Sequence, residues 1–245
     1  TRDWSSDVCS SYLIYLKAPS REFFLGTDAL GRCVFSRMIY GASRTIFSSL
    51  ILVSLMFVFG SFIGIISGYI GGLFDNIVMR IVDVFLAFPS LVLAIAVAGV
   101  LGGGMINAMI AIGVIGWTKY ARLARGEVLE IKEETFIKAA RLSGNSSMYI
   151  VFKHIMPRVL STLIVTASLD IGTTIMEMAA LSFLGLSSPL PIPEWGAMMN
   201  EGKSMIQFAP WITIAPGIAI FIIVILFNLL GDVVHDMLDP KQKEY

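Results

Sequence analysis

Charged residues are scarce in this 245-residue sequence: 15% are Asp, Glu, Lys or Arg, whereas 56% are hydrophobic. An average soluble domain carries about 25% charged residues, so the composition argues against an ordinary soluble protein. Basic and acidic residues both number 18, and the formal net charge is zero. No overall attraction to nucleic acid is therefore expected.

Cysteine and histidine are scarce as well. Two cysteines, Cys9 and Cys33, are too few for a disulfide framework. The two histidines, His154 and His235, are isolated, and no stretch has the ligand spacing of a metal site. Neither a metal nor another cofactor is expected. The phosphate-binding pattern G-x-x-x-x-G-K-[ST] is also missing, so we do not expect the chain to hydrolyse ATP itself.

Long apolar runs make up much of what is present. A helix needs about 20 residues to cross roughly 30 Å of hydrocarbon, and with their flanks five segments reach or approach that length. We predict an all-α membrane protein with five visible transmembrane helices within residues 45–240. The expected spans are 45–69, 75–101 with a kink at Pro89, 105–120, 160–184 and 212–230.

The residues before the first span fall into two parts. Residues 1–12 are polar and patternless, and we interpret them as a tail that is not native to the protein. Residues 13–44 predict an extracytoplasmic amphipathic segment. In it, Thr27 or Asp28 is expected to cap a short interfacial helix that ends at Gly41.

Several smaller patterns add expectations about packing. Arg80 and Asp83 are three residues apart and are expected to pair on one helix face. Trp195 and Trp211 are expected to anchor the chain at the membrane interface. Small residues at every fourth position let two helices approach closely in lipid, and the first span has glycines at positions 60, 64 and 68.

One long polar stretch, residues 121–158, separates the third span from the fourth. Eight basic residues lie from Lys119 to Arg158, and since cytoplasmic loops are enriched in such residues, we expect this stretch in the cytoplasm. Its pattern predicts a helix, a break and a second helix. Gly144 suits the left-handed position after a helix end. Asn145 or Ser146 is expected to cap the next helix, which stops at Pro157.

A cytoplasmic loop at 121–158 fixes the expected side of every other segment. Residues 187–210 and 17–44 then lie outside, and the tail 241–245 lies inside. The segment 17–44 carries five basic residues, which opposes the charge rule. We give the long loop more weight because the rule is a bias and not a law.

Two acidic residues, Asp170 and Glu177, lie inside the fourth span. They are seven residues apart and therefore share one helical face. Ionisable groups at membrane depth face the bundle interior or a water-filled path. Two interpretations stay open: a functional role in transport, and simple pairing with neighbouring helices or an interface.

The long loop also carries a specific pattern. Lys138-Ala139-Ala140, three residues, Gly144, nine residues and then His154-Ile155-Met156-Pro157 resembles the EAA loop of ABC importer permeases. That pattern reads EAA, three residues, G, nine residues and I-x-L-P. The spacing matches throughout. Lys138 stands for Glu, His154 for Ile and Met156 for Leu.

Six stretches in the same order are similar to the second, C-type, permease subunit of dipeptide, oligopeptide and nickel importers. They are LGTDALGRCVFSRMIYGA (25–42), MRIVDVFLAFPSLVLAIA (79–96), FIKAARLSGNSSMYIVFKHIMP (136–157), ALSFLGLS (180–187), EWGAMMNEG (194–202) and FNLLGDVVHDMLDP (227–240). Cys33 stands where this family usually has aspartate. The family has six spans, so the resemblance implies a chain that lacks the first.

The resemblance implies a non-catalytic subunit of an ATP-driven importer in the cytoplasmic (inner) membrane of a prokaryote. It would carry peptides or a related small solute such as a nickel chelate. Its implied partners are a sister permease in a heterodimer, two cytoplasmic ATP-binding subunits, an extracytoplasmic solute-binding protein and membrane lipid. The hairpin would contact the ATPase through the residues that match the motif: Lys138, Ala139, Ala140, Gly144, Asn145, His154, Ile155 and Pro157.

Two other classes of function have less support in the sequence. An ion-coupled secondary transporter would use Asp170 and Glu177 as a proton or cation relay and predicts an inverted repeat, but no convincing repeat is visible. A membrane-embedded enzyme would need a convergent nucleophile or metal set, and the sequence offers none.

Overall fold

The computed structural model describes residues 15–187 and 192–238. Within those ranges the chain is helical, with one isolated bridge between Thr27 and Cys33 and no strand, so the predicted all-α class is confirmed there. The predicted tails 1–12 and 241–245 lie outside the described residues. The elements are α1 Val34–Ile70, α2 Gly72–Leu86, α3 Ser90–Leu101, α4 Met105–Lys132, α5 Thr135–Leu142, α6 Ser147–Ile150, a π-helical turn η2 Val151–Ile155, α7 Met156–Phe183, α8 Trp195–Gly202, a 3₁₀ turn η3 Lys203–Met205 and α9 Trp211–Leu238.

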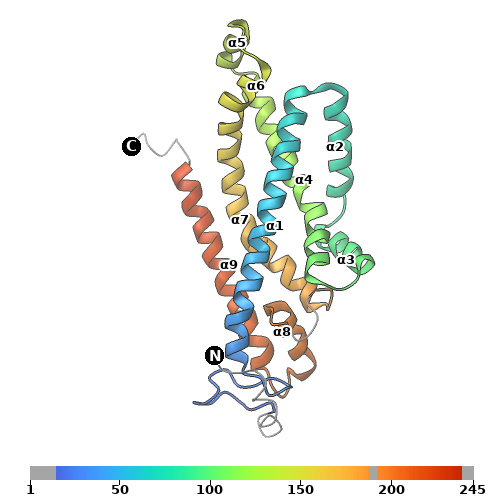
Figure 1. The fold of residues 1–245 in the computed structure, drawn as a ribbon, viewed down its shortest axis with the longest axis vertical. Coiled ribbons are helices and arrows are strands. Elements are labelled where there is room, and N and C mark those ends of the chain that lie inside the picture. Colours follow the sequence, from blue (N-terminus) through green and yellow to red (C-terminus); the bar gives the residue numbers. More distant parts are fainter. Residues whose placement is uncertain (1–14, 188–191, 239–245) are drawn as a thin grey trace.

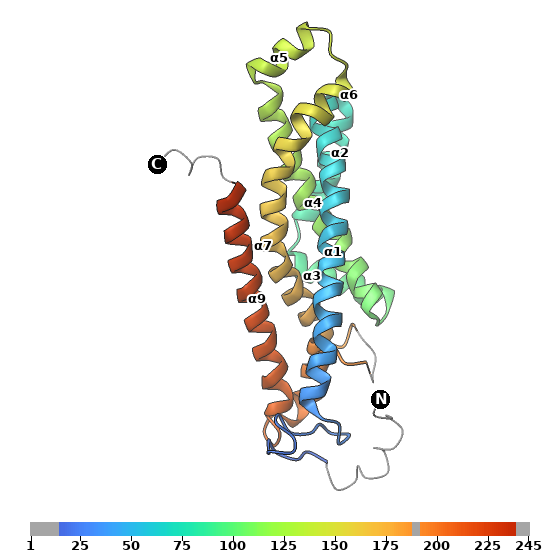
Figure 2. The ribbon, with the colours of Figure 1, turned by 60° about the vertical axis from the view of Figure 1, so that its left-hand side comes forward.

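Four long helices, α1, α4, α7 and α9, run along the long axis of the molecule (Figures 1 and 2). The short helices α5 and α6 form one end. The segment before α1 and the helix α8 lie together at the opposite end, and α9 runs from there toward the α5–α6 end. The elongated shape therefore has two chemically different ends separated by the long helices.

Three helical segments are long and apolar enough to cross a membrane: Val34–Ile70, Ser147–Phe183 and Trp211–Leu238. A fourth is reached if the bent pair α2 and α3 counts as one span. Helix α4, whose second half carries several basic residues, is not among them. On length and composition the described residues thus contain three or four candidate spans, fewer than the five predicted.

Helix α1 is longer than predicted. A separate interfacial helix ending at Gly41 is wrong, because α1 runs without interruption from Val34 to Ile70. Gly41 is inside this helix and faces Trp195, whose Cδ1 would lie 3.3 Å from an added Cβ. The predicted cap is also wrong. Cys33 occupies the N-cap position without a side-chain bond, while the Asp28 carboxylate accepts bonds from the backbone N–H groups of Leu30 and Arg32.

The second predicted span is broken and not merely kinked. Helices α2 and α3 meet at 89°. The residue before a proline is disfavoured in the helical region, and Pro89 itself is extended, with ψ 123°. The chain therefore leaves α2 at Leu86 and begins α3 at Ser90 in a new direction.

The prediction that Pro157 stops the preceding helix is wrong. The chain is one continuous helix from Ser147 to Phe183, with Pro157 at the start of α7. The π-helical turn just before it makes the difference, because Met156 N–H donates to Val151 O, five residues back. Widening the turn accommodates a residue that has no N–H and whose ring crowds the previous turn.

The predicted close approach through glycines is confirmed. Helix α1 packs on α4 through Gly60, Gly64 and Gly68. A Cβ on Gly60 would lie 2.3 Å from Trp117 O, and one on Gly64 would lie 2.3 Å from Ala121 O. Backbone atoms cannot yield as a flexible side chain does, so only glycine permits this contact.

Two predicted contacts are replaced by others. Asp83 forms an ion pair with Arg122 of α4 and not with Arg80. Trp195 is buried, and its indole N–H donates to Met38 O at 2.9 Å, so it is a core residue and not an exposed anchor. Trp211 likewise donates to Thr27 O, at 3.2 Å. Both tryptophans join residues more than 150 positions apart, which local patterns do not reveal.

Candidate functional site

A pocket of about 680 Å³ lies beside the break between α2 and α3. Leu86 and Ser90, on the two sides of the break, both line it, and side chains from α1, α4 and α7 complete the wall. Broken helices are a common way to build a polar site at membrane depth, because the free helix ends and the turn line a cavity. Asp170 and Glu177, the two acids predicted to share a face, both line this pocket.

The Asp170 carboxylate is bound by three neighbouring side chains. Its carboxylate forms an ion pair with Lys119 and accepts hydrogen bonds from Tyr120 Oη at 2.8 Å and Thr173 Oγ1 at 3.1 Å. Three donors, one of them a cation, satisfy a buried carboxylate. The open interpretation of simple pairing within the bundle is therefore the better one for Asp170.

Glu177 has much weaker support. Its Oε1 accepts a hydrogen bond from Ser90 Oγ at 3.4 Å, at the N-terminal end of α3. Within the described part of the chain it forms no ion pair. The other cation in the wall, Arg122, is paired with Asp83. The two acids predicted as one relay thus differ. Asp170 forms an ion pair, whereas Glu177 forms none among the described residues.

The second candidate site is the hairpin of α5 and α6 at one end of the molecule (Figure 1). Gly144 has φ +80°, as predicted for the residue after a helix end. Asn145 N–H donates to Ala140 O at 3.3 Å, and Gly144 N–H donates to Arg141 O at 3.0 Å, which closes α5 with the paired bonds typical of a glycine C-cap. Asn145 adds a side-chain bond to Ala140 O.

The second helix of the hairpin is capped by one of the two predicted residues. Ser146 Oγ accepts a hydrogen bond from Tyr149 N–H at 3.3 Å. Asn145 does not cap it. Ile150 and Ile155 on this helix are buried together with Ile137 of α5, so the hairpin has a small apolar core. The turn is held by local bonds, which explains why it was predictable from sequence.

Ion pairs join the hairpin to the long helices, and ring contacts join the parts of the hairpin to one another. Arg158 of α7 donates two hydrogen bonds, at 2.7 and 2.8 Å, to the Glu134 carboxylate just before α5. Lys138 donates to Glu133 and thereby holds the pKa of that exposed carboxyl below its usual value. The His154 ring lies edge-on to Phe136 and Tyr149.

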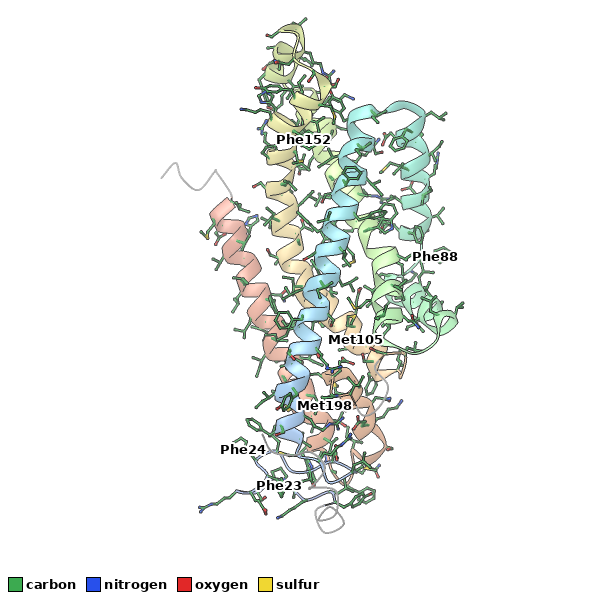
Figure 3. The ribbon with its side chains drawn as sticks, in the orientation of Figure 1. Phe23, Phe24, Phe88, Met105, Phe152 and Met198 are labelled. Atoms are coloured by element: carbon green, nitrogen blue, oxygen red, sulfur yellow. The ribbon has the colours of Figure 1, made fainter. Side chains whose placement is uncertain are left out.

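The outer surface of the hairpin is apolar and exposed. Leu142 is 91% exposed and Met148 is 66% exposed, and Phe152 projects from the same end (Figure 3). Among the predicted contact residues, Ile155 is buried and Ala140 and His154 are half-buried. The others are exposed: Lys138, Ala139, Gly144, Asn145 and Pro157. Exposed apolar patches beside polar residues mark protein-binding surfaces.

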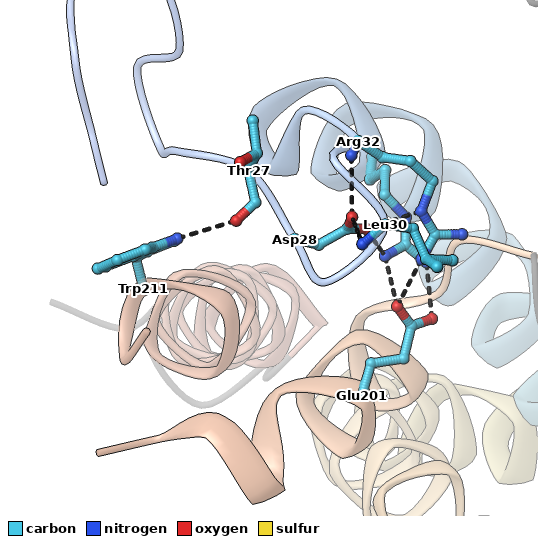
Figure 4. A network of polar contacts seen from close by, with 7 residues as sticks. Thr27, Asp28, Leu30, Arg32, Glu201 and Trp211 are labelled. Atoms are coloured by element: carbon cyan, nitrogen blue, oxygen red, sulfur yellow. Dashed lines mark hydrogen bonds and ion pairs between the residues drawn. The ribbon is translucent and has the colours of Figure 1, made fainter. Parts of the chain in front are cut away.

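Sequence reasoning missed a network at the opposite end. Arg32 and Arg37 each pair with both Asp28 and Glu201, at 2.6–2.8 Å (Figure 4). The network joins the segment before α1 to α8, and Cys33, which stands where the resembled family has aspartate, takes no part in it. The spacing of residues 28, 32 and 37 could have suggested part of it, but Glu201 is over 160 residues away in sequence.

Long apolar helices that enclose a largely apolar pocket with two acidic side chains, and that carry an exposed hairpin at one end, are typical of an integral membrane transport component. The family described as "binding-protein-dependent transport system inner membrane component" matches residues 60–244. The chain belongs to that family.

Two similar relatives are named as transport system permease proteins. The chain is 43% identical over 228 residues to the dipeptide transport system permease protein DppC of Alkalihalophilus pseudofirmus, covering 93% of this chain and 75% of the relative. It is 43% identical over 227 residues, with the same two shares, to the glutathione transport system permease protein GsiD of Pectobacterium atrosepticum.

Solved structures agree on the fold. A chain of the inward-facing MetNI methionine ABC transporter superposes with a TM-score of 0.67 at 20% identity, covering 84% of this chain and 98% of that one. A chain of an amino acid ABC transporter superposes with a TM-score of 0.57 at 14% identity, covering 83% and 94%. The chain is therefore a permease subunit of an ABC importer, a transport component and not an enzyme.

Proposed function

We propose that the chain forms one half of the path by which an ATP-driven importer carries short peptides across the cytoplasmic membrane of a bacterium. The names of two relatives, a dipeptide and a glutathione permease, support peptide-like solutes. In this proposal α1, the bent pair α2–α3, α4, α7 and α9 are the five spans. A sister permease supplies the other half of the path.

The observation that carries the proposal is the α5–α6 hairpin. It has its own apolar core, a glycine-closed turn and exposed large apolar side chains, and it lies at the end opposite α8 (Figure 1). These are the properties of a surface that docks into a groove on another protein. We assign that groove to a cytoplasmic ATPase subunit, and the α8 end to a solute-binding protein.

The continuity of α7 with the hairpin supports coupling between the two sites. One helix runs from Ser147, in the hairpin, through Asp170 and Glu177, in the pocket, to Phe183. The Arg158–Glu134 bonds hold α5 against this helix. A displacement of the docked hairpin would therefore move the pocket wall, because helices shift as packed units.

The ion-coupled alternative has less support. A relay needs both acids to exchange protons or cations, yet Asp170 is held by Lys119, Tyr120 and Thr173. Membership of a binding-protein-dependent transport family also favours ATP as the energy source.

Replacement of Gly144 tests the docking site. The chain is tagged and expressed with its sister permease and ATPase subunits, and the ATPase that co-purifies in detergent is measured. Gly144→Val places a branched residue at φ +80°. A left-handed residue with a Cβ costs roughly 1–2 kcal/mol, and about 1.4 kcal/mol is tenfold in an equilibrium. We expect about a tenfold loss of co-purified ATPase from this strain alone.

Gly126→Val is the matched control. An added Cβ at Gly126 meets nothing within 4 Å and the residue lies in α4, outside the hairpin. This variant should retain the ATPase at the level of the unmodified chain. Equal retention by both variants would remove the hairpin as the docking site.

A further inference from the structure

Among the described residues, Glu177 is the one carboxylate lining the pocket beside the α2–α3 break that forms no ion pair. Lys119 is paired with Asp170, and Arg122 with Asp83. Glu177 receives a single hydrogen bond, from Ser90 at 3.4 Å, and forms no ion pair among the described residues. The remaining wall is mostly apolar, with Met56, Leu86 and Ile115 among its members.

An unpaired carboxylate in such surroundings is costly, and cores that need only packing do not contain one. Its presence at the wall of a cavity favours a cation that arrives with a ligand. A bound Ca²⁺ or Mg²⁺ would need about six oxygen ligands, whereas no group of three or more metal-binding side chains exists in the described ranges. The chemistry fits an organic cation.

We propose that Glu177 binds the protonated amino group of a solute inside this pocket, and that the solute class is short peptides with a free amino terminus. The inference rests on the proposed function and adds a recognition site within the permease. A volume of about 680 Å³ is in the range of small-ligand sites, about 300–1,000 Å³. The apolar wall accommodates peptide side chains of varied shape.

The positions of the charges along α7 support a peptide of two or three residues. Asp170 and Glu177 are seven residues apart, which is about 10 Å along a helix axis. An extended peptide spans about 3.3–3.6 Å per residue. An extended peptide of two or three residues, about 7–11 Å long, therefore fits between the levels of Glu177 and Asp170, the two carboxylates of the pocket wall.

The test uses the whole transporter in proteoliposomes, with sister permease, ATPase subunits and solute-binding protein. Uptake of radiolabelled alanyl-phenylalanine is measured for the unmodified chain, Glu177→Gln and Glu177→Asp. We expect at least a tenfold loss for the amide and a smaller loss for aspartate, which keeps the charge. Asp232→Asn, an exposed carboxylate on α9, is the matched control and should retain uptake. Uptake by Glu177→Gln within twofold of the unmodified chain overturns the proposal.

A second experiment alters the charge after assembly, so that a folding defect cannot produce the result. Glu177→Cys is made in a background with Cys9→Ser and Cys33→Ser, and the assembled transporter is modified with 2-sulfonatoethyl or 2-aminoethyl methanethiosulfonate. The negative adduct should support at least fivefold more uptake than the positive one. Equal uptake by the two adducts overturns the proposal.

Failure of the ammonium site and failure of the proposed function give different results. If the unmodified transporter assembles and hydrolyses ATP but does not carry the dipeptide, the proposed substrate class is wrong and this site is wrong with it. If it carries the dipeptide and neither experiment at position 177 changes uptake, the permease function stands and only the ammonium site is withdrawn.

Discussion

At the scale of single residues, Glu194 shows how strongly position controls chemistry. The side chain is 1% exposed. One carboxylate oxygen accepts from Gly196 N–H at 3.1 Å, while the other has no partner among the described residues. Burial raises the pKa of this carboxyl above its usual value, because the charged form loses its hydration.

The raised pKa of Glu194 predicts how stability changes with pH. The folded state holds the proton more tightly than the unfolded state, so this contribution to stability is fully present below the ordinary glutamate pKa, about 4.3, and is lost as pH rises through the folded pKa. Glu194→Gln removes the titration. The apparent unfolding temperature of this variant in detergent should therefore fall less than that of the unmodified protein between pH 4 and pH 8.

Glu22→Gln is the control for this pH series. Glu22 is an exposed glutamate at the same end of the molecule, and among the described residues it forms an ion pair with Lys17 alone. An exposed pair contributes little to stability, so its pH curve should parallel that of the unmodified protein. Parallel curves for Glu194→Gln and the unmodified protein would contradict the predicted role of Glu194.

Glycines mark the limit of what single residues reveal in the sequence. Gly144 was predicted correctly because its role depends on φ and on bonds to residues three to five positions away. Gly41 was misread as a helix end because its role is to face Trp195, far along the chain. The two glycines look alike locally. Asp170 likewise gave no sign in the sequence that Lys119 and Tyr120 would pair with it.

At the scale of elements, the α1–α4 contact depends on a close approach of two helix backbones. Gly64→Ala would place a Cβ 2.3 Å from the backbone oxygen of Ala121, and the two helices would have to separate. Overpacking of this kind costs about 1–3 kcal/mol. We expect a lower unfolding temperature in detergent and a smaller yield of assembled protein, measured by size-exclusion chromatography.

A matched alanine on α3 separates packing from helix propensity. A Cβ at Gly99 meets nothing within 4 Å, and alanine favours a helix over glycine by about 1 kcal/mol. Gly99→Ala should leave stability unchanged or raise it. If both alanine variants behaved alike, the close approach at Gly64 would not be the cause.

Helix boundaries show why apolar spans could be predicted more easily than their shapes. Apolar length is a local property, and it located α1, α7 and α9. The 89° break at Pro89 and the continuation through Pro157 depend on what surrounds each proline. At Pro89 a free helix end faces the pocket, whereas at Pro157 a π-helical turn absorbs the missing bond. Proline therefore breaks the helix at position 89, whereas at position 157 the helix continues through it.

At the scale of the whole molecule, the structure explains a conflict in the charge distribution. The segment 17–44 is basic although it was expected outside, against the usual bias. Three of its five basic residues are paired with acids in the folded protein: Lys17 with Glu22, and Arg32 and Arg37 with Asp28 and Glu201. Arg32 and Arg37 join the N-terminal segment to α8 through Glu201, so these two cations have a structural role at this end.

The orientation that follows is open to a direct measurement. Ala18 lies in the segment before α1 and Ala139 lies in the hairpin, and both are exposed. Ala18→Cys and Ala139→Cys are made separately in a background with Cys9→Ser and Cys33→Ser, and expressed with the sister permease but without the ATPase subunits. Spheroplasts are then treated with a membrane-impermeant maleimide. Cys at position 18 should react at once, and Cys at position 139 only after the membrane is permeabilised.

Each outcome of the labelling decides the direction of the molecule, because the segment before α1 and the α5–α6 hairpin lie at opposite ends of the long helices (Figure 1). The reverse pattern would put the hairpin outside, where no ATP-binding subunit could reach it, and would remove it as the coupling site. The expected pattern puts the hairpin on the side of the ATPase subunits and the α8 end on the side from which the solute arrives. Helix α7 then connects the hairpin to Glu177 in the pocket. The expected pattern also requires that the paired arginines at the α8 end remain outside despite the bias against them.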